Sequence, residues 1–394
     1  MQEIVTQSLF LPFQLFAAFL RLGLTAFGGP AMIPRIAELA VKREQWLSPA
    51  VFKDGVALAQ VIPGATAMQV AAYVGLRAGE PLGAAAAFVG FSLPAFCLMV
   101  GLSWTYEIGR SLPMADAVFQ GVGAIVVALI AHATIGFGRA WMKCWQEAAI
   151  AAAVFAYYLS GLTPYWAVPL AALAGMVLLK GKTAGMAPSG TPMAAHKPWL
   201  AALAILAGAA VITALLWLSG ERLLAELSIT MARIDLFAFG GGFGSLPIMA
   251  HEVVEVRQWL DARAFLDGIA LGQVTPGPIV ITATFVGWLV AGGAGAIVAT
   301  VAVFLPSFLV LLATTPLVDR IKHSPLVGNA LHGVCASATG LIAALGVKLA
   351  VAQPWSDLSA GIGLLAFTAL MMKRDPLWVI LAGVALSIVL GAAG

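Results

Sequence analysis

Charged residues are scarce in this chain. Only 10% of its 394 residues are Asp, Glu, Lys or Arg, whereas 61% are hydrophobic. Soluble domains carry about 25% charged residues. A soluble globular protein of this composition would have too little polar surface to present to water, so that class is excluded. Helices satisfy their backbone hydrogen bonds without water, and the composition therefore predicts an all-α membrane protein that crosses the bilayer several times.

Cysteine and recognisable cofactor motifs are also rare or missing. The three cysteines, Cys97, Cys144 and Cys335, lie in or beside apolar segments without metal-like spacing, so we expect packing residues and no disulfide framework. The sequence shows no repeated cluster of His, Asp, Glu and Cys and no nucleotide or haem motif. The N-terminus has Glu3, no basic region and no cleavage motif. We therefore expect no enzyme, no cofactor, no metal, no nucleic-acid partner and no cleaved signal peptide.

The chain does contain a long internal repeat. The stretch from Arg21 to Pro30 returns from Arg233 to Gly242, and the stretch from Phe52 to Gly64 returns from Phe265 to Gly277, always 212 or 213 residues later. Duplicated halves in so hydrophobic a chain are typical of membrane transporters. The sequence predicts an N-terminal repeat over 1–180, a linker with a connecting helix over 181–220, and a C-terminal repeat over 221–394.

Continuous membrane spans are expected after each motif region. They cover 82–106, 112–138, 146–162 and 164–180, with counterparts at 293–315, 325–351, 356–372 and 376–393. The stretch from Lys180 to Lys197 reads as a loop, and 198–219 is a span without a counterpart. An odd number of crossings between equivalent points turns the second half upside down.

The placement of basic residues tests this inversion. The positive-inside rule places the linker, with Lys180, Lys182 and Lys197, in the cytoplasm. Counting back, Arg139 and Lys143 also fall inside. The loop 353–357, which occupies their place in the second half, falls outside and has no basic residue. The sequence therefore predicts two inverted halves, with about 9 to 13 crossings in total.

Four helix breaks occur at corresponding places. The apolar stretches 49–78 and 262–291 are split by Pro63-Gly64 and Pro276-Gly277, and 9–27 and 221–239 end at Gly-Gly pairs. Thirty helical residues would reach about 45 Å, well beyond a hydrocarbon core of about 30 Å. Each split stretch is therefore either a re-entrant hairpin or a strongly broken, tilted helix. The Gly-Gly pairs are each followed by an amphipathic stretch.

The breaks predict one site for a small oxyanion. A broken helix exposes backbone N–H groups at a new N-terminus, and these groups together with the helix dipole favour an anion. Two arginines add positive charge nearby, and glutamines and threonines offer neutral hydrogen bonds. The candidate substrate-binding residues are Arg21, Phe27, Gly28, Gly29, Pro30, Gln60, Pro63, Gly64 and Thr66, with Arg233, Gly240, Gly241, Gly242, Gln273, Thr275, Pro276, Gly277 and Pro278.

Three residues are candidates for proton coupling, namely Asp54, Asp267 and His132. For the two aspartates we favour a different interpretation, in which they begin helices and complement the helix dipole. His132 has no counterpart in the other half and is a weaker candidate for a proton relay.

These residues resemble the chromate ion transporter family in its long, two-domain form. The resemblance rests on Phe27-Gly28-Gly29-Pro30, Gln60-Val-Ile-Pro63-Gly64 and their copies, and it covers nearly the whole chain. It implies a bacterial inner-membrane protein that exports chromate, confers chromate resistance, uses the proton motive force and is competed by sulfate. The two copies differ, because Gly242 replaces the proline of the first motif and only the second corner continues into Pro278.

Several alternatives stay open at this point. A sulfate or oxyanion uptake system, or an anion channel, could use the same dipole-lined cavity. The sequence does not separate chromate from sulfate, or proton antiport from symport. Besides the oxyanion and the lipid bilayer, the partner left open is a second copy of the chain in a homodimer.

Overall fold

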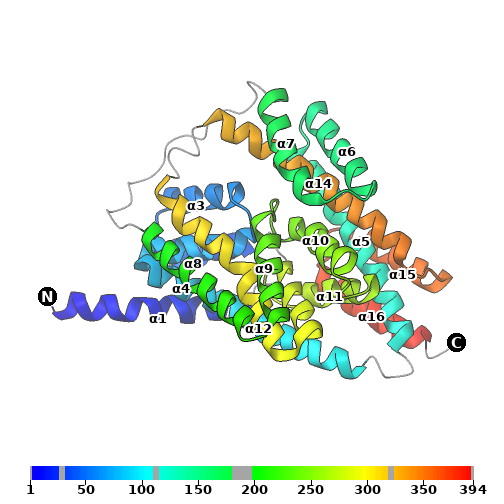
Figure 1. The fold of residues 1–394 in the computed structure, drawn as a ribbon, viewed down its shortest axis with the longest axis horizontal. Helices are drawn as coiled ribbons and strands as arrows, with labels where there is room; N and C mark the ends of the chain where they lie inside the picture. The colour runs from blue at the N-terminus through cyan, green and yellow to red at the C-terminus, as the bar shows by residue number, and fades with distance from the viewer. Residues whose placement is uncertain (1, 26–31, 110–114, 180–197, 318–323, 392–394) are drawn as a thin grey trace.

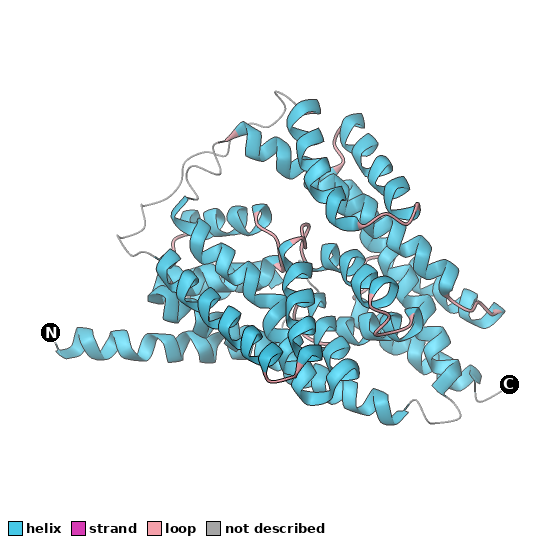
Figure 2. Ribbon diagram, in the orientation of Figure 1, coloured by secondary structure: helices cyan, strands magenta, loops and turns pink. Residues whose placement is uncertain are grey.

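The structure is a computed structural model that describes residues 2–25, 32–109, 115–179, 198–317 and 324–391. Helices and short connections make up this part of the chain, and it contains no strand (Figure 2). The first half comprises α1 (Gln2–Thr25), α2 (Met32–Ala37), the π-helix η2 (Glu38–Arg43), α3 (Pro49–Val61), α4 (Thr66–Gly109), α5 (Ala115–Trp141), α6 (Trp145–Leu159) and α7 (Pro164–Leu178).

The unpaired helix α8 (Pro198–Leu218) leads into the second half. That half comprises α9 (Arg222–Leu236), α10 (Gly242–Ala250), the π-helix η3 (His251–Val256), α11 (Ala262–Val274), the short 3₁₀-helix η4 (Ile279–Ile281), α12 (Thr282–Thr314), η5 (Thr315–Leu317), α14 (Pro325–Ala352), α15 (Asp357–Met371) and α16 (Pro376–Gly391).

The repeat in the sequence is a repeat of the backbone. The two π-helices begin 213 residues apart, at Glu38 and His251. Each is followed by a residue with positive φ, Gln45 at 52° in the first half and Gln258 at 53° in the second. Since φ > 0 is uncommon for residues other than glycine, this shared feature shows that both halves adopt the same local fold.

The apolar stretches split by Pro-Gly are re-entrant hairpins. In the first, a Cβ at Gly55 would lie 2.2 Å from the Tyr73 ring, and these two residues lie nine positions before and nine after Gly64. In the second, Gly268 of α11 receives the ring of Phe285 in the same way. Each arm of about 13 residues reaches only about 20 Å, which is too short to cross the hydrocarbon core. The chain therefore turns back, and the alternative of a strongly broken, tilted helix is wrong.

The longest helices continue from these hairpins across a kink. Backbone angles leave the helical region at Gly79 and Glu80 in α4, and at Ala291 and Gly292 in α12. The expected spans 82–106 and 293–315 lie on the far side of these kinks. In the part of the chain that the structure describes, five helices are long and apolar enough to cross a membrane: Thr66–Gly109, Gln120–Trp141, Pro198–Leu218, Ile279–Leu317 and Pro325–Ala352. Four shorter apolar helices accompany them, and the expected linker falls outside the described residues.

Contacts between α4 and α12 show that the halves are inverted. Tyr106, near the end of α4, packs on Phe285 near the start of α12, with ring centroids 5.0 Å apart. Phe88, earlier in α4, packs on Phe308, later in α12, at 4.9 Å. These equivalent helices therefore run antiparallel. The two-fold axis that relates them is perpendicular to both, so it lies in the plane of the membrane, as in inverted-repeat transporters.

The two halves also exchange helices. Helices α6 and α7 of the first half pack on α14 of the second, whereas α15 and α16 pack on α5 (Figure 1). Small residues make these crossings close. A Cβ at Gly333 of α14 would lie 2.1 Å from the Ala171 carbonyl oxygen and 3.0 Å from Gly175 Cα in α7. Close approach of this kind is how membrane helices associate, because dispersion contacts replace the hydrophobic effect there.

We expect Gly333→Leu to destabilise the folded protein by about 2 kcal/mol or more, because the new side chain must push α7 and α14 apart. The measurement is the thermal stability of detergent-solubilised protein, read as the loss of the monodisperse peak in size-exclusion chromatography. The matched control is Gly361→Leu on α15, where a Cβ meets nothing within 4 Å. Equal melting temperatures for the two variants would contradict the packing.

Candidate functional site

Three of the predicted breaks meet at one place. The backbone N–H of Gly64, in the first-half corner, donates to the carbonyl of Ala238 before the second-half Gly-Gly pair, at 2.8 Å. A Cβ at Gly241 would lie 3.5 Å from Thr66 Oγ1 at the start of α4. A Cβ at Gly242 would lie 2.8 Å from the Ile279 side chain, where η4 leads into α12. The starts of α4, α10 and the η4–α12 helix therefore converge.

Each Pro-Gly corner packs on the proline kink of the opposite half. A Cβ at Gly64 would lie 2.3 Å from Ser307 Cβ, next to Pro306, and a Cβ at Gly277 would lie 3.0 Å from Ala95 Cβ, next to Pro94. The φ angles of the two glycines are 108° and 117°. Only glycine adopts this backbone readily and leaves room for the facing helix. In each half the residue that directly follows a Leu-Pro pair, Ala95 or Ser307, receives the corner of the other half.

Two polar side chains that the sequence analysis missed hold this region together. Asp235 of α9 is fully buried, and its Oδ2 accepts the backbone N–H of Ser307 at 2.7 Å. Gln69 of α4 is also fully buried, and its amide donates to the carbonyl of Pro63. The repeat contained a signal for the first of these, because the position of Asp235 corresponds to Gly23 in the first half.

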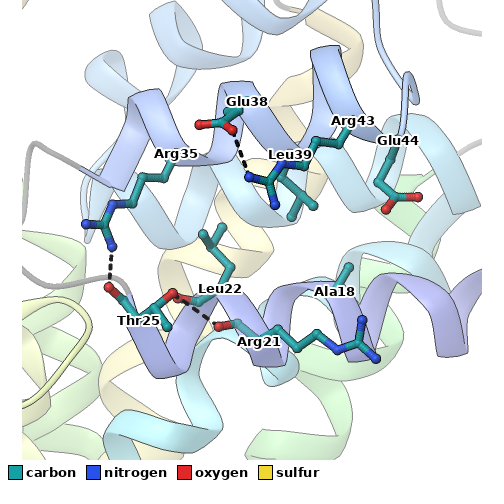
Figure 3. Close-up of a pocket in the computed structure, with 9 residues that line it drawn as sticks. All are labelled: Ala18, Arg21, Leu22, Thr25, Arg35, Glu38, Leu39, Arg43 and Glu44. Carbon is teal, nitrogen blue, oxygen red and sulfur yellow. Dashed lines mark hydrogen bonds and ion pairs between the residues drawn. The ribbon is translucent and has the colours of Figure 1, made fainter.

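The two predicted arginines lie on their own helices beside the amphipathic segments. Arg21 is exposed on α1 and lines a cavity of about 450 Å³ between α1 and the α2–η2 segment (Figure 3). Arg233 is half-exposed on α9, with its guanidinium 3.8 Å from Glu252 and stacked 4.8 Å from the Tyr165 ring centroid. The cavity and the converging breaks are separate features, and no described contact joins either arginine to Thr66 or Gly241.

The remaining predicted binding residues have varied surroundings. Gln60 is exposed on the last turn of α3, whereas the Gln273 amide nitrogen is buried without a hydrogen-bond partner among the described residues. Thr275 is buried and its hydroxyl donates to the Gly272 carbonyl, so it ends α11. Pro276, Gly277 and Pro278 are buried at the second corner. Phe27, Gly28, Gly29 and Pro30 lie outside the described residues.

Neither Asp54 nor Asp267 begins a helix, so that interpretation is wrong. The N-caps are Ser48 for α3 and Asp261 for α11, whose side chains accept from the backbone of Val51 and Ala264. The two predicted aspartates are buried in the second turn, and Asp267 accepts the Tyr106 hydroxyl of the first half at 2.8 Å. His132 is half-buried on α5, with no hydrogen bond or ion pair to another described residue.

The amphipathic segment of the second half is clamped to its neighbours. We use "second-half clamp" for two groups of contacts. In one, Glu255 of η3 bonds His251 at 2.9 Å and Lys348 of α14 at 2.8 Å, and the Lys348 ammonium lies 3.8 Å from the centroid of the Tyr158 ring. In the other, Arg257 pairs with Glu226 at 2.9 Å and with Glu252 at 3.5 Å, and Glu252 faces Arg233.

Among the described residues, the equivalent segment of the first half has no ion pair to another helix, and Arg35 of α2 ties it to α1 by donating to the Thr25 carbonyl (Figure 3). Its described ion pair, Arg43 with Glu38 at 2.9 Å, is exposed and internal to η2. Gly136 of α5 corresponds to Lys348 and would meet nothing within 4 Å if it carried a Cβ. The cavity beside Arg21 lies on this looser side. Among the described residues, cross-helix ion pairs therefore hold the second-half segment, whereas the first-half segment leaves a cavity beside α1.

Comparison with known proteins agrees with this duplicated architecture. The profile of the Chromate transporter family matches the chain twice, at residues 13–176 and 225–388. An uncharacterized transporter of Methanocaldococcus jannaschii is 38% identical over 96% of this chain and 93% of its own length.

Two relatives have chromate in their names. A probable chromate transport protein of Synechococcus elongatus is 33% identical, covering 94% of both chains. The chromate transport protein of Cupriavidus metallidurans is 31% identical over 95% of this chain and 91% of its own. No solved structure matches. Two family matches that together span most of the chain, at the interval of the internal repeat, show that this multi-pass membrane protein belongs to the chromate transporter family.

Proposed function

We propose that this chain is a secondary active transporter that exports chromate across the cell membrane and thereby confers chromate resistance. The observation that carries the proposal is the convergence of three helix starts from both halves at Gly64, Gly241 and Ile279, in a member of the chromate transporter family. Sulfate competes, because both anions are tetrahedral and carry two negative charges.

The chemistry of the site suits such an anion. Backbone N–H groups at helix starts, aligned with the helix dipoles, bind anions without a buried cation. Thr66 adds a hydroxyl donor beside Gly241. In transporters with inverted repeats, broken helices present these ends to an anionic substrate near the middle of the bilayer. An inside-negative potential assists outward movement of the dianion by about 2.3 kcal/mol per charge per 100 mV.

Transport proceeds by alternating access around this site. In this scheme the second-half clamp closes the site toward one side of the membrane, and the first-half segment beside Arg21 closes it toward the other. The first-half segment contains four basic residues and the second-half segment only Arg257 and Arg263, so the positive-inside rule assigns the first-half segment to the cytoplasm. The ion pairs of the clamp then favour the inward-facing state, and transport requires the clamp to release while the first-half segment closes.

The direct test is chromate uptake into everted membrane vesicles, with sulfate as competitor and an imposed pH gradient. Uptake that saturates, falls with added sulfate and collapses with the membrane potential supports the exporter. Flux that rises linearly with concentration identifies a channel instead, and accumulation only in right-side-out vesicles identifies an uptake system.

We expect Thr66→Val to raise the KM for chromate roughly tenfold, because a hydrogen bond to a charged group contributes about 1.5–3 kcal/mol. Valine keeps the shape of threonine, so expression and chromatographic behaviour stay normal. The control is Thr368→Val on α15, whose exposed hydroxyl bonds only the Leu364 carbonyl. An unchanged KM in Thr66→Val would remove this hydroxyl from the site.

We expect Arg21→Ala to lower chromate flux several-fold at low ionic strength, because the exposed guanidinium attracts the anion into the cavity. The difference shrinks near 1 M salt, where the Debye length falls to about 3 Å. The control is Lys42→Ala, which removes the same charge from η2 outside the cavity lining. Equal flux in both variants would show that Arg21 acts only as a surface charge.

We expect Glu255→Gln to loosen the second-half clamp by about 1 kcal/mol, because its ion pair is partly exposed. The measurement is labelling of Ser245→Cys by an impermeant maleimide, with Cys97, Cys144 and Cys335 replaced by serine. Ser245 is fully buried in α10, so labelling reports opening, and the rate rises about fivefold. The control, Glu38→Gln, breaks the exposed pair of the first half.

The pKa of Glu255 predicts how this clamp responds to pH. Hydrogen bonds from His251 and then Lys348 lower the pKa of Glu255 to about 2, against an opposing effect of burial. A lowered pKa stabilises the folded clamp above the ordinary value of 4.5, and the stabilisation is lost only as the pH falls through about 2. Glu255 therefore stays ionised, and its ion pair with Lys348 does not weaken between pH 5 and 8.

A further inference from the structure

A buried carboxyl group lies beside the converging breaks and has no cation of its own. Asp235 is 0% exposed, and one of its oxygens bonds the Ser307 backbone while the other has no hydrogen-bond partner among the described residues. Ser307 contacts the first-half corner at Gly64, whose N–H bonds Ala238, three residues after the aspartate. The Asp235 carboxyl group is thus separated from the corner at Gly64 by one residue, Ser307.

The described residues around Asp235 include no cation that pairs with it. The helices with the most extensive packing on α9 are α8, α10 and α12, and none contains an Asp, Glu, His, Lys, Arg, Tyr or Cys. On α9 itself, Glu226 pairs with Arg257, and Arg233 faces Glu252 and Tyr165 on the half-exposed side. An ionised carboxylate there is costly, and proton uptake removes that cost.

The first half lacks this group. Gly23 holds the corresponding place in α1, where a Cβ would lie 2.6 Å from the Phe91 carbonyl oxygen and 3.2 Å from Pro94. Both halves thus use this position to face the proline kink of the long helix, but only the second offers a titratable side chain. The shared architecture does not require an acid here, since glycine serves in the other copy.

We propose that Asp235 binds the proton that accompanies the oxyanion during transport. This proposal rests on the proposed function. A bound dianion repels the carboxylate across the corner, so the anion and the proton bind together and leave together. Each cycle carries one dianion and one proton outward. The net charge moved is one negative charge, and the inside-negative potential still drives export.

The test compares wild type with Asp235→Asn, which keeps the shape and can still accept from Ser307. Chromate uptake into everted vesicles is measured from pH 7 to 9 on the loading side. The apparent KM of the wild type rises up to tenfold per pH unit, whereas that of Asp235→Asn changes less than twofold over the range. Asp261→Asn, an exposed N-cap in which asparagine also caps, keeps the wild-type slope.

A second measurement does not depend on any variant. With a pH-sensitive dye inside wild-type vesicles, chromate uptake carries protons into the lumen, and Asp235→Glu retains this signal. Wild-type uptake without proton movement overturns the proposal, and so does an unchanged pH slope in Asp235→Asn. The proposal is also overturned if Asp267→Asn, rather than Asp235→Asn, abolishes the pH dependence of the KM. Wild-type vesicles that accumulate no chromate would instead refute the exporter itself.

Discussion

The structure depends on satisfying backbone polar groups where helices are interrupted inside a membrane. Lipid offers no hydrogen bonds, so each interrupted helix needs a partner within the protein. The Gly64 N–H finds one in the Ala238 carbonyl of the other half, and the Ser307 N–H finds one in Asp235. These hydrogen bonds satisfy the backbone at the helix breaks, and they also bring the breaks of the two halves together. The breaks of the two halves therefore meet at one place, and neither half forms this junction alone.

Much of this fold could be predicted from the sequence, because hydropathy and the Pro-Gly pairs mark the helices and their ends. The expected span 325–351 is observed as Pro325–Ala352, and the expected 198–219 as Pro198–Leu218. The inversion followed from an odd connecting helix and the placement of basic residues, and the antiparallel crossing of α4 and α12 confirms it. Hydropathy and the fixed interval between the repeated motifs were enough to predict the helix bounds and the inversion of the halves.

Contacts between distant segments could not be obtained in the same way. The sequence shows that Asp54 and Asp267 are acidic but not where their helices begin, and Ser48 and Asp261 proved to be the caps. The ion pair of Arg233 with Glu252 depends on the rotation of η3 against α9, which no spacing rule fixes. The repeated motifs do not single out Asp235, because Gly23 holds the corresponding position in the first half.

Under the proposed alternating access, those differences between the copies would set the balance between the two conformations. Two identical inverted halves would give inward- and outward-facing states of equal free energy. In the repeat, Lys348 corresponds to Gly136 and Glu252 corresponds to Leu39. These charged residues therefore form ion pairs that hold the second-half segment and have no equivalent at those positions of the first half. A resting preference of a few kcal/mol leaves the other state sparsely populated until a ligand favours it.

The exchange of helices between halves has a consequence for how the protein is made. Helices α6 and α7 leave the ribosome well before α14, the helix on which they pack. Until residues 325–352 are inserted, the small-residue face around Gly175 has only lipid beside it. The nascent first half must wait, incompletely packed, for most of the second to be synthesised. Translation speed through the connecting region, and insertion factors that shelter waiting helices, should therefore influence the yield of folded transporter.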